Sequence, residues 1–475
     1  MERATAAHRE NSRENSRETD ERGRRRRQRR ASAIAAVAAV LVGYDMGVIS
    51  GALLFIVPEF RLSPLQSGAV VTTLLAGAVF GAAVAGWVAQ AIGRRATLVV
   101  TCLVYVVSSV VMAVAPSYAW LLVGRALAGF AVGSTQSTVP TYLAELAPTD
   151  TRGRHSSGNQ LMIATGILIS AVINYFFARD LSWRWSLGLA AIPAILIALA
   201  LLRQSETPRW LMLKGRVDDA RRVLNSLLPT EEAKHAYDEL DAARRQDVVR
   251  GTESASLTWR ALLRSRALRR VLVIATVFSM AQQLLGINSI VYYAPTILTK
   301  VGFGTQAALI NTVGFGVLSV VMTLLCGYLV DRTGRRPLLI VGGIVLGVAM
   351  LSVGAVFGFH LLGTFAGQSI SLTMLSIFKA GYSLTWGPVV WIMLPELFPL
   401  RARSAGVSLA ASAQILVTVF LTLYFPSLIA HGATGIFAFF GVFGLVAAVF
   451  VGRLLPETSG QSLESLHLSE LGGTR

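Results

Sequence analysis

The chain has 475 residues, of which 53% are hydrophobic and 15% are charged, and its formal net charge is +17. A soluble globular domain carries about a quarter charged residues, so this composition predicts an all-α polytopic membrane protein and argues against a soluble one. The basic excess does not indicate a nucleic-acid partner, because membrane proteins collect Arg and Lys on their cytoplasmic loops.

Residues 1–30 are polar and rich in arginine, and they end in GRRRRQRR. We expect a disordered, basic cytoplasmic tail. A secretory signal peptide is the alternative, but the apolar run that follows is too long for one. The arginines act either as a topology signal alone or also as a contact with anionic lipid.

The first apolar segment, Ala31–Val57, contains a single charged residue, Asp45. A helix of this length crosses a hydrocarbon core of about 30 Å, and a carboxylate at that depth is costly. Arg125 enters the membrane from the other direction, and both residues are expected about 10 Å from the outer surface. An arginine partner favours the charged carboxylate and burial favours the neutral form. We therefore predict that Asp45 is a proton-binding group paired with Arg125; a static structural ion pair is the alternative.

Further apolar segments follow in two groups of similar size, separated by a polar stretch over 203–268 that reads as short soluble helices. The first group is Gln66–Ile92, Arg95–Ala115, Tyr118–Ala144, His155–Ala178 and Arg184–Leu202. The second group is Arg269–Leu298, Gln306–Val330, Pro337–Phe359, Leu362–Leu394, Ala402–Leu428 and Thr434–Leu454. Together with the first segment they predict twelve transmembrane helices and place both termini in the cytoplasm.

The predicted organisation is a tail (1–30), a six-helix bundle (31–203), a cytoplasmic helical domain (204–268), a second six-helix bundle (269–455) and a final tail (456–475). The two bundles repeat one another, since GWVAQAIGRR at 86–95 matches GYLVDRTGRR at 327–336 and ELAPTDTRGR at 145–154 matches ELFPLRARSA at 396–405. Duplicated halves indicate alternating access around a site at the membrane midplane.

The motifs GYDMGVISG (43–51), GRALAGFAVG (124–133), VPTYLAELAPTDTRG (139–153), AQQLLGINSIVYYAP (281–295), GPVVWIMLPELFP (387–399) and PETSGQSLE (456–464) occur in this order. With them the chain resembles the sugar porter family of the major facilitator superfamily. The resemblance implies two six-helix bundles, a cytoplasmic helical domain and a monosaccharide or polyol substrate. It also implies proton symport, because related facilitators carry Asn where this chain has Asp45.

Three amides, Gln282, Gln283 and Asn288, lie near one face of the seventh predicted helix. Amides both donate and accept hydrogen bonds, which suits a ring of neutral hydroxyls. The intervening GIN sequence is expected to loosen the helix, as in the discontinuous helices of transporter sites. The alternative is that these polar side chains only hold helices together.

The resemblance assigns further roles in the substrate site. It implies that Gln282, Gln283 and Asn288 bind sugar, that Gln160 is the substrate glutamine of the first half, and that Gln414 contacts hydroxyls. It implies that Tyr292 and Tyr293 gate the outside and that Trp391 stacks on a sugar face, although an interfacial tryptophan is the other interpretation of Trp391.

Charged residues at the expected cytoplasmic helix ends form another set. They are Arg94, Glu145, Arg152, Glu206, Arg209, Asp331, Arg335, Arg336, Glu396 and Arg401. The resemblance implies salt bridges that clamp the inside shut while the outside is open, with Glu206 and Arg209 tying in the central helices. Simple positive-inside topology accounts for part of the set.

Some positions depart from the family pattern. Gln90 and Ala91 replace the usual Asp and Arg, which predicts a weaker clamp in the first half and a bias toward an inward-open state. Ser319 replaces a sugar-contacting Asn, Ile415 replaces a Trp, and Ile167 stands where some pentose carriers have Gln. We therefore expect a pocket less polar and less aromatic than is usual in the family.

Lys379 is a cation within an apolar run. It has three possible roles: reaching outward to the interface, pairing with a carboxylate or contacting an anionic substrate. The outward orientation is the one we expect.

The function predicted from the sequence is proton-coupled symport of a neutral hexose or pentose across a bacterial plasma membrane. A proton-linked polyol or myo-inositol carrier and an uncoupled facilitator are the nearest alternatives; a sugar-sensing receptor and a proton/drug antiporter fit the motifs less well. An enzyme is not expected, because the sequence shows no nucleotide loop, metal-ligand cluster or nucleophile–base pair. We expect a monomer in contact with lipid, with no cofactor, no metal and no nucleic acid.

Overall fold

The computed structural model describes residues 39–146, 152–177, 183–250, 265–399 and 402–457, and the regular secondary structure within these ranges is helical. Helices suit this composition because a hydrocarbon core offers backbone N–H and C=O groups no other partners, and a helix pairs them within one segment. The predicted tail over 1–30 and all of the tail after residue 457 lie outside the described residues.

The first half of the chain begins with a helix over Ala39–Glu59. It continues with α2 (Pro64–Ile92), α3 (Arg94–Ala113), α4 (Tyr118–Leu146), α5 (Arg152–Phe177), α6 (Trp183–Gly188) and α7 (Ala191–Leu202). The sequence predicted one helix where α6 and α7 stand. The interruption falls before Pro193, whose ring clashes with the carbonyl four residues earlier in a continuous helix.

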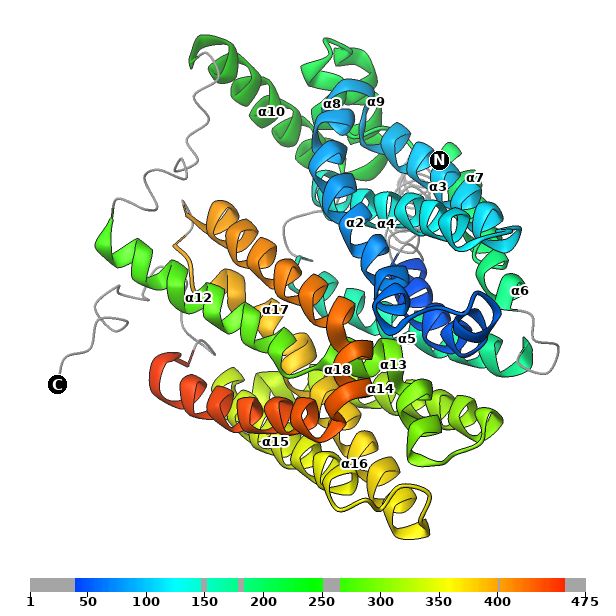
Figure 1. Cartoon of the computed structure of the whole chain (residues 1–475). Coiled ribbons are helices and arrows are strands. Elements are labelled where there is room, and N and C mark those ends of the chain that lie inside the picture. The colour runs from blue at the N-terminus through cyan, green and yellow to red at the C-terminus, as the bar shows by residue number, and fades with distance from the viewer. Residues whose placement is uncertain (1–38, 147–151, 178–182, 251–264, 400–401, 458–475) are drawn as a thin grey trace, which may run out of the picture.

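The polar stretch forms the expected short helices: α8 (Pro208–Leu213), α9 (Val217–Leu227) and α10 (Thr230–Arg250). They lie at one end of the helical bundles, which we call the α8–α10 face; the other end is the far face (Figure 1). Trp210 donates from Nε1 to the carbonyl of Gln90 at the end of α2 (3.1 Å), and the Tyr142 hydroxyl donates to the carbonyl of Ser205 (3.1 Å). These bonds fix α8 to the ends of α2 and α4.

The second half consists of α12 (Arg266–Leu284), α13 (Ile287–Val301), α14 (Thr305–Thr333), α15 (Arg335–Gly358), α16 (Phe365–Leu384), α17 (Trp386–Glu396) and α18 (Arg403–Leu454). Two predicted spans are each broken in two, at Gly286 and at Thr385. The last two predicted spans share α18, which has non-helical dihedrals at Gly432 and bends there (Figure 1). With these breaks allowed for, the helices correspond to the twelve predicted spans.

The two halves contact each other through α5 with α14 and through α2 with α18. A Cβ on Gly68, the fifth residue of α2, would lie 2.0 Å from the carbonyl oxygen of Leu423 on α18, so only glycine permits this approach. Because α2 starts at the far face, this contact closes the halves there. Toward the α8–α10 face the halves diverge (Figure 1).

Candidate transport site

The glycines of the first helix determine how it is seated. Gly43, Gly47 and Gly51 are four residues apart and so lie on one face of the helix. A Cβ on Gly43 would lie 2.0 Å from the carbonyl oxygen of Ile163 on α5. Asn174, also on α5, donates from Nδ2 to the carbonyl of Gly47 at 3.2 Å. The glycine face of the first helix therefore packs against α5, and Asp45 lies on another side of the helix.

Asp45 forms a buried ion pair with Arg125 on α4. Nη1 of Arg125 lies 3.3 Å from each carboxylate oxygen, and the two side chains are only 2% and 0% exposed. Nε of Arg125 donates to the carbonyl of Val70 on α2 (3.0 Å), and the hydroxyl of Tyr105 on α3 lies 3.5 Å from Oδ1 of Asp45. The pair therefore joins all of the first four helices.

The matched depths of Asp45 and Arg125 indicated this contact from sequence; the contacts with Val70 and Tyr105 were not foreseen. Nη2 of Arg125 is buried and has no hydrogen-bond partner among the described residues. Taking two charges out of water is costly unless their remaining hydrogen-bonding groups are satisfied. The ion pair is therefore incompletely compensated.

The loosened helix expected at the GIN sequence is a complete break. Gly286 has φ +87°, a left-handed conformation that glycine adopts without steric cost. The break ends α12 just after Gln282 and Gln283 and starts α13 just before Asn288. Nδ2 of Asn288 donates to Oε1 of Gln283 across it (2.6 Å).

Gln282 is held by three protein groups. Its Nε2 donates to the carbonyls of Trp386 (2.8 Å) and Gly387 (3.3 Å) in the first turn of α17, and its Oε1 accepts from Nε2 of Gln414 on α18 (2.7 Å). The amide is 1% exposed. The structure joins Gln282 to Gln414 by a hydrogen bond between α12 and α18. Their contact with sugar stays a prediction.

A cavity lies between the two halves. The space between its atoms is about 490 Å³, which includes the part open to solvent. The first helix and α5 form one wall, and α13, α14, α16 and α17 form the other. Its polar lining includes Gln160, Asn288, Ser319, Thr323, Lys379 and Tyr382.

Two of the predicted sugar-binding residues, Gln160 and Asn288, line this cavity, and Gln283 reaches it through its bond to Asn288. Trp391 does not line it and is 42% exposed. Ser319 lines the cavity and shares a hydrogen bond with Ser383 (2.8 Å).

Sequence reasoning missed Tyr382 and Ser383 and misplaced Lys379. We expected Lys379 to reach outward, but its side chain is 7% exposed and lines the cavity. The available signal was spacing: Tyr382 and Ser383 follow Lys379 by three and four residues, so all share one face of α16. A polar helix face of this kind turns inward because lipid offers it no partners.

The two predicted gate tyrosines are buried in the wall of α13. Tyr293 donates its hydroxyl to the carbonyl of Thr422 (3.1 Å), and its ring lies 5.3 Å from that of Phe425 on α18. Tyr292 is 1% exposed. Both lie on the half-helix that runs from the break toward the far face, where the halves meet.

The charged helix ends repeat between the halves. Arg94 pairs with Glu145 (3.1 Å) in the first half, and Arg335 pairs with Glu396 (3.2 Å) in the second. Glu206 accepts the backbone N–H of Arg94 (3.0 Å). In the second half, the N–H groups of Arg335 and Arg336 each donate to Glu457 at 3.0 Å. These acidic residues sit at the N-termini of α3 and α15, where they complement the helix dipoles.

Each of the pairs just described joins elements within one half, in keeping with halves that close at the far face. Glu457 takes the same part in the second half that Glu206 takes in the first, and sequence reasoning did not single it out.

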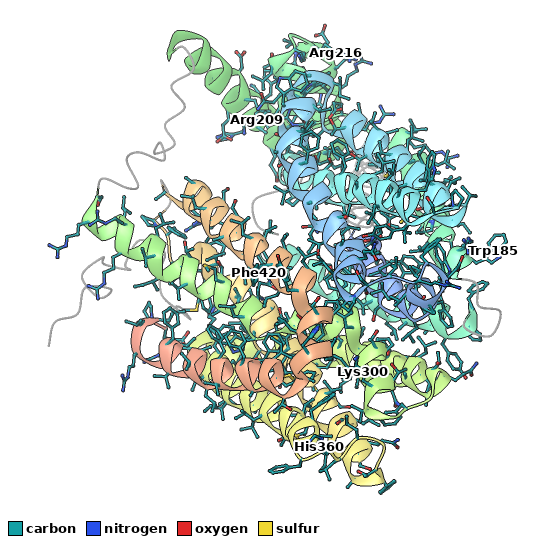
Figure 2. All side chains as sticks on the ribbon, viewed as in Figure 1. Trp185, Arg209, Arg216, Lys300, His360 and Phe420 are labelled. Carbon is teal, nitrogen blue, oxygen red and sulfur yellow. The ribbon has the colours of Figure 1, made fainter. Side chains whose placement is uncertain are left out.

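Arg209 is exposed near Arg216 at the α8–α10 face, with Lys300 and His360 toward the far face (Figure 2). The side chains of Arg152 and Asp331, and all of Arg401, lie outside what the structure describes.

A family model described as sugar (and other) transporter matches residues 31–468. The chain belongs to this sugar transporter family. It is therefore a multi-pass membrane protein that transports sugars and is not an enzyme.

Relatives of known structure or activity cover almost the whole chain. The glucose transporter GlcP of Staphylococcus epidermidis is 36% identical over 92% of this chain and 96% of its own. The major myo-inositol transporter IolT of Bacillus subtilis is 35% identical over 90% of this chain and 91% of its own. A partially occluded inward-open structure of the xylose transporter XylE from E. coli matches with a TM-score of 0.77 at 28% identity, covering 92% of this chain and 99% of XylE. XylE has the twelve-helix major facilitator fold, as does this sugar transporter.

Two glutamine variants of this sugar transporter are expected to differ, one changing the stability of the protein and the other its sugar binding. Gln282→Ala is expected to lower the free energy of unfolding by about 1–3 kcal/mol, because it leaves Gln414 and two α17 carbonyls without their partner. Gln160→Ala removes a cavity-lining amide with no partner among the described residues and is expected to leave stability unchanged while weakening sugar binding. Thermal unfolding and sugar titration of both purified variants measure this. Equal melting temperatures for the two would contradict it.

Proposed function

We propose that this sugar transporter couples the entry of a monosaccharide to the inward movement of protons across a bacterial plasma membrane. The observation that carries the proposal is the buried Asp45–Arg125 pair beside the cavity: Met46, the next residue, lines it. Among the relatives, XylE is described as a proton:xylose symporter and GlcP as a glucose transporter.

The chemistry of coupling follows from the pair's surroundings. Burial favours the protonated, neutral carboxyl and Arg125 favours the carboxylate, so a small change in their separation changes which form is stable. Protonation of Asp45 weakens its attraction for Arg125 and so changes how the first helix is held against α2, α3 and α4. Since the first helix also forms a cavity wall, protonation alters the same wall that receives the sugar. A proton thereby biases the equilibrium between two conformations.

The α8–α10 face is proposed to be cytoplasmic. It carries the arginines that begin α3 and α15 (Arg94, Arg95, Arg335, Arg336), and loops rich in arginine remain in the cytoplasm. The far face, where α2 and α18 touch, is then outside, and the cavity opens inward. A partially occluded inward-open structure of XylE and an inward-open one match this chain with TM-scores of 0.77 and 0.76, which supports this orientation of the opening.

The cytoplasmic helix-end pairs are proposed to meet across the halves when the outside is open, as a clamp. Gln160, Gln283 and Asn288 are proposed to bind the sugar hydroxyls, with Gln282 and Gln414 holding the break behind them. Tyr292 and Tyr293 are proposed to close the outside. A neutral hexose or pentose suits the amides, and a polyol such as myo-inositol is the alternative.

The test is uptake by proteoliposomes under an imposed pH gradient, acid outside. Labelled glucose, galactose, xylose, arabinose and myo-inositol form the panel. A gradient of about one pH unit supports about tenfold accumulation if one proton accompanies each sugar. We expect accumulation of at least one member of the panel, and collapse to the outside concentration when the gradient is dissipated. Equilibration without accumulation would identify a facilitator.

A further inference from the structure

One group in the cavity is not explained by a neutral sugar. The Lys379 side chain is 7% exposed, lines the cavity and has no hydrogen-bond or ion-pair partner among the described residues. An unpaired cation is costly in a membrane interior, and such residues mark pathways or ligand counter-ions. The outward position that would relieve this cost is not the one it adopts.

The residues around Lys379 supply no counter-ion. The cavity lining contains hydroxyls, amides and apolar groups but no carboxylate. On the opposite wall, Asp45 precedes the cavity-lining Met46, but it is paired with Arg125 and lies 3.5 Å from the Tyr105 hydroxyl. Positive charge in the cavity is therefore uncompensated.

The two helix breaks add to this positive potential. The first turns of α13 and α17 both line the cavity, through Asn288 and Gly387, and neither helix has a side chain capping its N-terminus. Helix N-termini carry partial positive charge and free N–H groups, and broken helices in transporters present them to anionic substrate groups. At the C-termini of the preceding helices, backbone carbonyls already accept hydrogen bonds. The N–H of Gly286 donates to the carbonyl of Gln283, and the N–H of Thr385 donates to the carbonyl of Gly381.

We propose that the substrate is a monosaccharide acid, a uronate or aldonate, whose carboxylate pairs with Lys379 while its hydroxyls meet Gln160, Asn288 and the Ser319–Ser383 hydroxyls. This rests on the proposed function, which makes this cavity the sugar site, and it names an anionic monosaccharide in place of the neutral one given there. A carboxylate suits the site better than a phosphate ester, because a phosphate carries about two negative charges and favours arginine forks, and the cavity lining has no arginine.

A charge consequence follows. A neutral sugar carried with one proton moves one positive charge, whereas a monoanionic sugar acid carried with one proton moves none. Uptake of the acid therefore responds to a pH gradient and not to a membrane potential imposed with potassium and valinomycin.

The experiment compares D-galacturonate with D-galactose, which differ only in a carboxylate for a hydroxymethyl group, by titration calorimetry on the purified full chain. We expect galacturonate to bind at least about tenfold more tightly. Lys379→Met, which removes the charge at similar length, is expected to lower galacturonate affinity by at least about tenfold and galactose affinity by a much smaller factor. Lys379→Arg keeps the charge and should keep the preference.

Each other outcome is decisive. If galactose binds as well as galacturonate or better, the inference fails while the proposed function stands. If Lys379→Met weakens both ligands equally, the lysine is structural and the inference fails. If neither sugar nor acid from a wider panel binds, the proposed function fails with it. Should the variant not fold, the wild-type comparison still decides.

Discussion

Asparagine in place of Asp45 is expected to abolish uphill accumulation of sugar while leaving exchange of sugar across the membrane intact. The amide is nearly the same shape as the carboxyl but does not take up or release a proton in this range, so Arg125 keeps a hydrogen-bond acceptor and the coupling is lost. In proteoliposomes with an inward pH gradient of about one unit, the accumulation ratio should fall from about ten to one. Counterflow of labelled sugar, which needs no gradient, should continue.

Tyr105→Phe is the matched control. It removes the hydroxyl that lies 3.5 Å from the carboxylate but leaves the ion pair, so accumulation should persist. Undiminished accumulation by Asp45→Asn would assign Asp45 and Arg125 a purely structural role. Loss of counterflow as well would mean that the substitution blocks movement itself.

Tryptophan in place of Gly68 is expected to hold the far face open and stop transport. A Cβ there would already lie 2.0 Å from the carbonyl oxygen of Leu423, so the indole forces α2 and α18 apart. Overpacking of well-fitted contacts costs about 1–3 kcal/mol and sometimes more, so net uptake should fall by at least about tenfold. Spin labels at the exposed residues Ser63 and His431, near the far ends of α2 and the first part of α18, should move apart.

Gly86→Trp gives the control on the same helix, because a Cβ on Gly86 meets nothing within 4 Å. It should insert, fold and transport as the wild type does. Equal loss of uptake in both variants would point to a general effect of the indole. An unchanged label distance in Gly68→Trp would show that this contact does not govern closure.

The helices, the repeat and the ion pair could be predicted because they rest on local geometry. A fixed rise per residue places Asp45 and Arg125 at one depth without knowledge of the packing. The helix break at Gly286 was foreseen as a loosening of the helix, because a glycine lies there among the polar residues Gln283 and Asn288. Each of these signals can be read from sequence positions without knowing how the helices pack.

The break at Thr385 was not predicted, since 362–394 reads as one apolar run. Pro388 was the available signal, because its ring opposes the carbonyl of Leu384 in a continuous helix. Proline alone does not decide, since Pro295 lies inside unbroken α13. The second break differs in that the Gln282 amide, which is distant in the sequence, donates hydrogen bonds to two backbone carbonyls of α17.

The cavity's composition could not be read from the chain for a similar reason. Its wall takes residues from both halves, and which face of α16 looks inward depends on how that helix is rotated against α14 and α15. The rotation places Lys379 inside, where hydropathy suggested a side chain reaching outward. That rotation depends on the packing of several helices, which the sequence of a single segment does not reveal.

The most direct test of proton coupling is the external pH of a lightly buffered suspension of de-energised cells that express the protein, recorded as a sugar or sugar acid is added. Coupled entry predicts a transient alkalinisation with the transported substrate, and no pH change with that substrate in cells expressing Asp45→Asn. Entry of the labelled substrate with no alkalinisation in wild-type cells would contradict the account and leave an uncoupled sugar transporter.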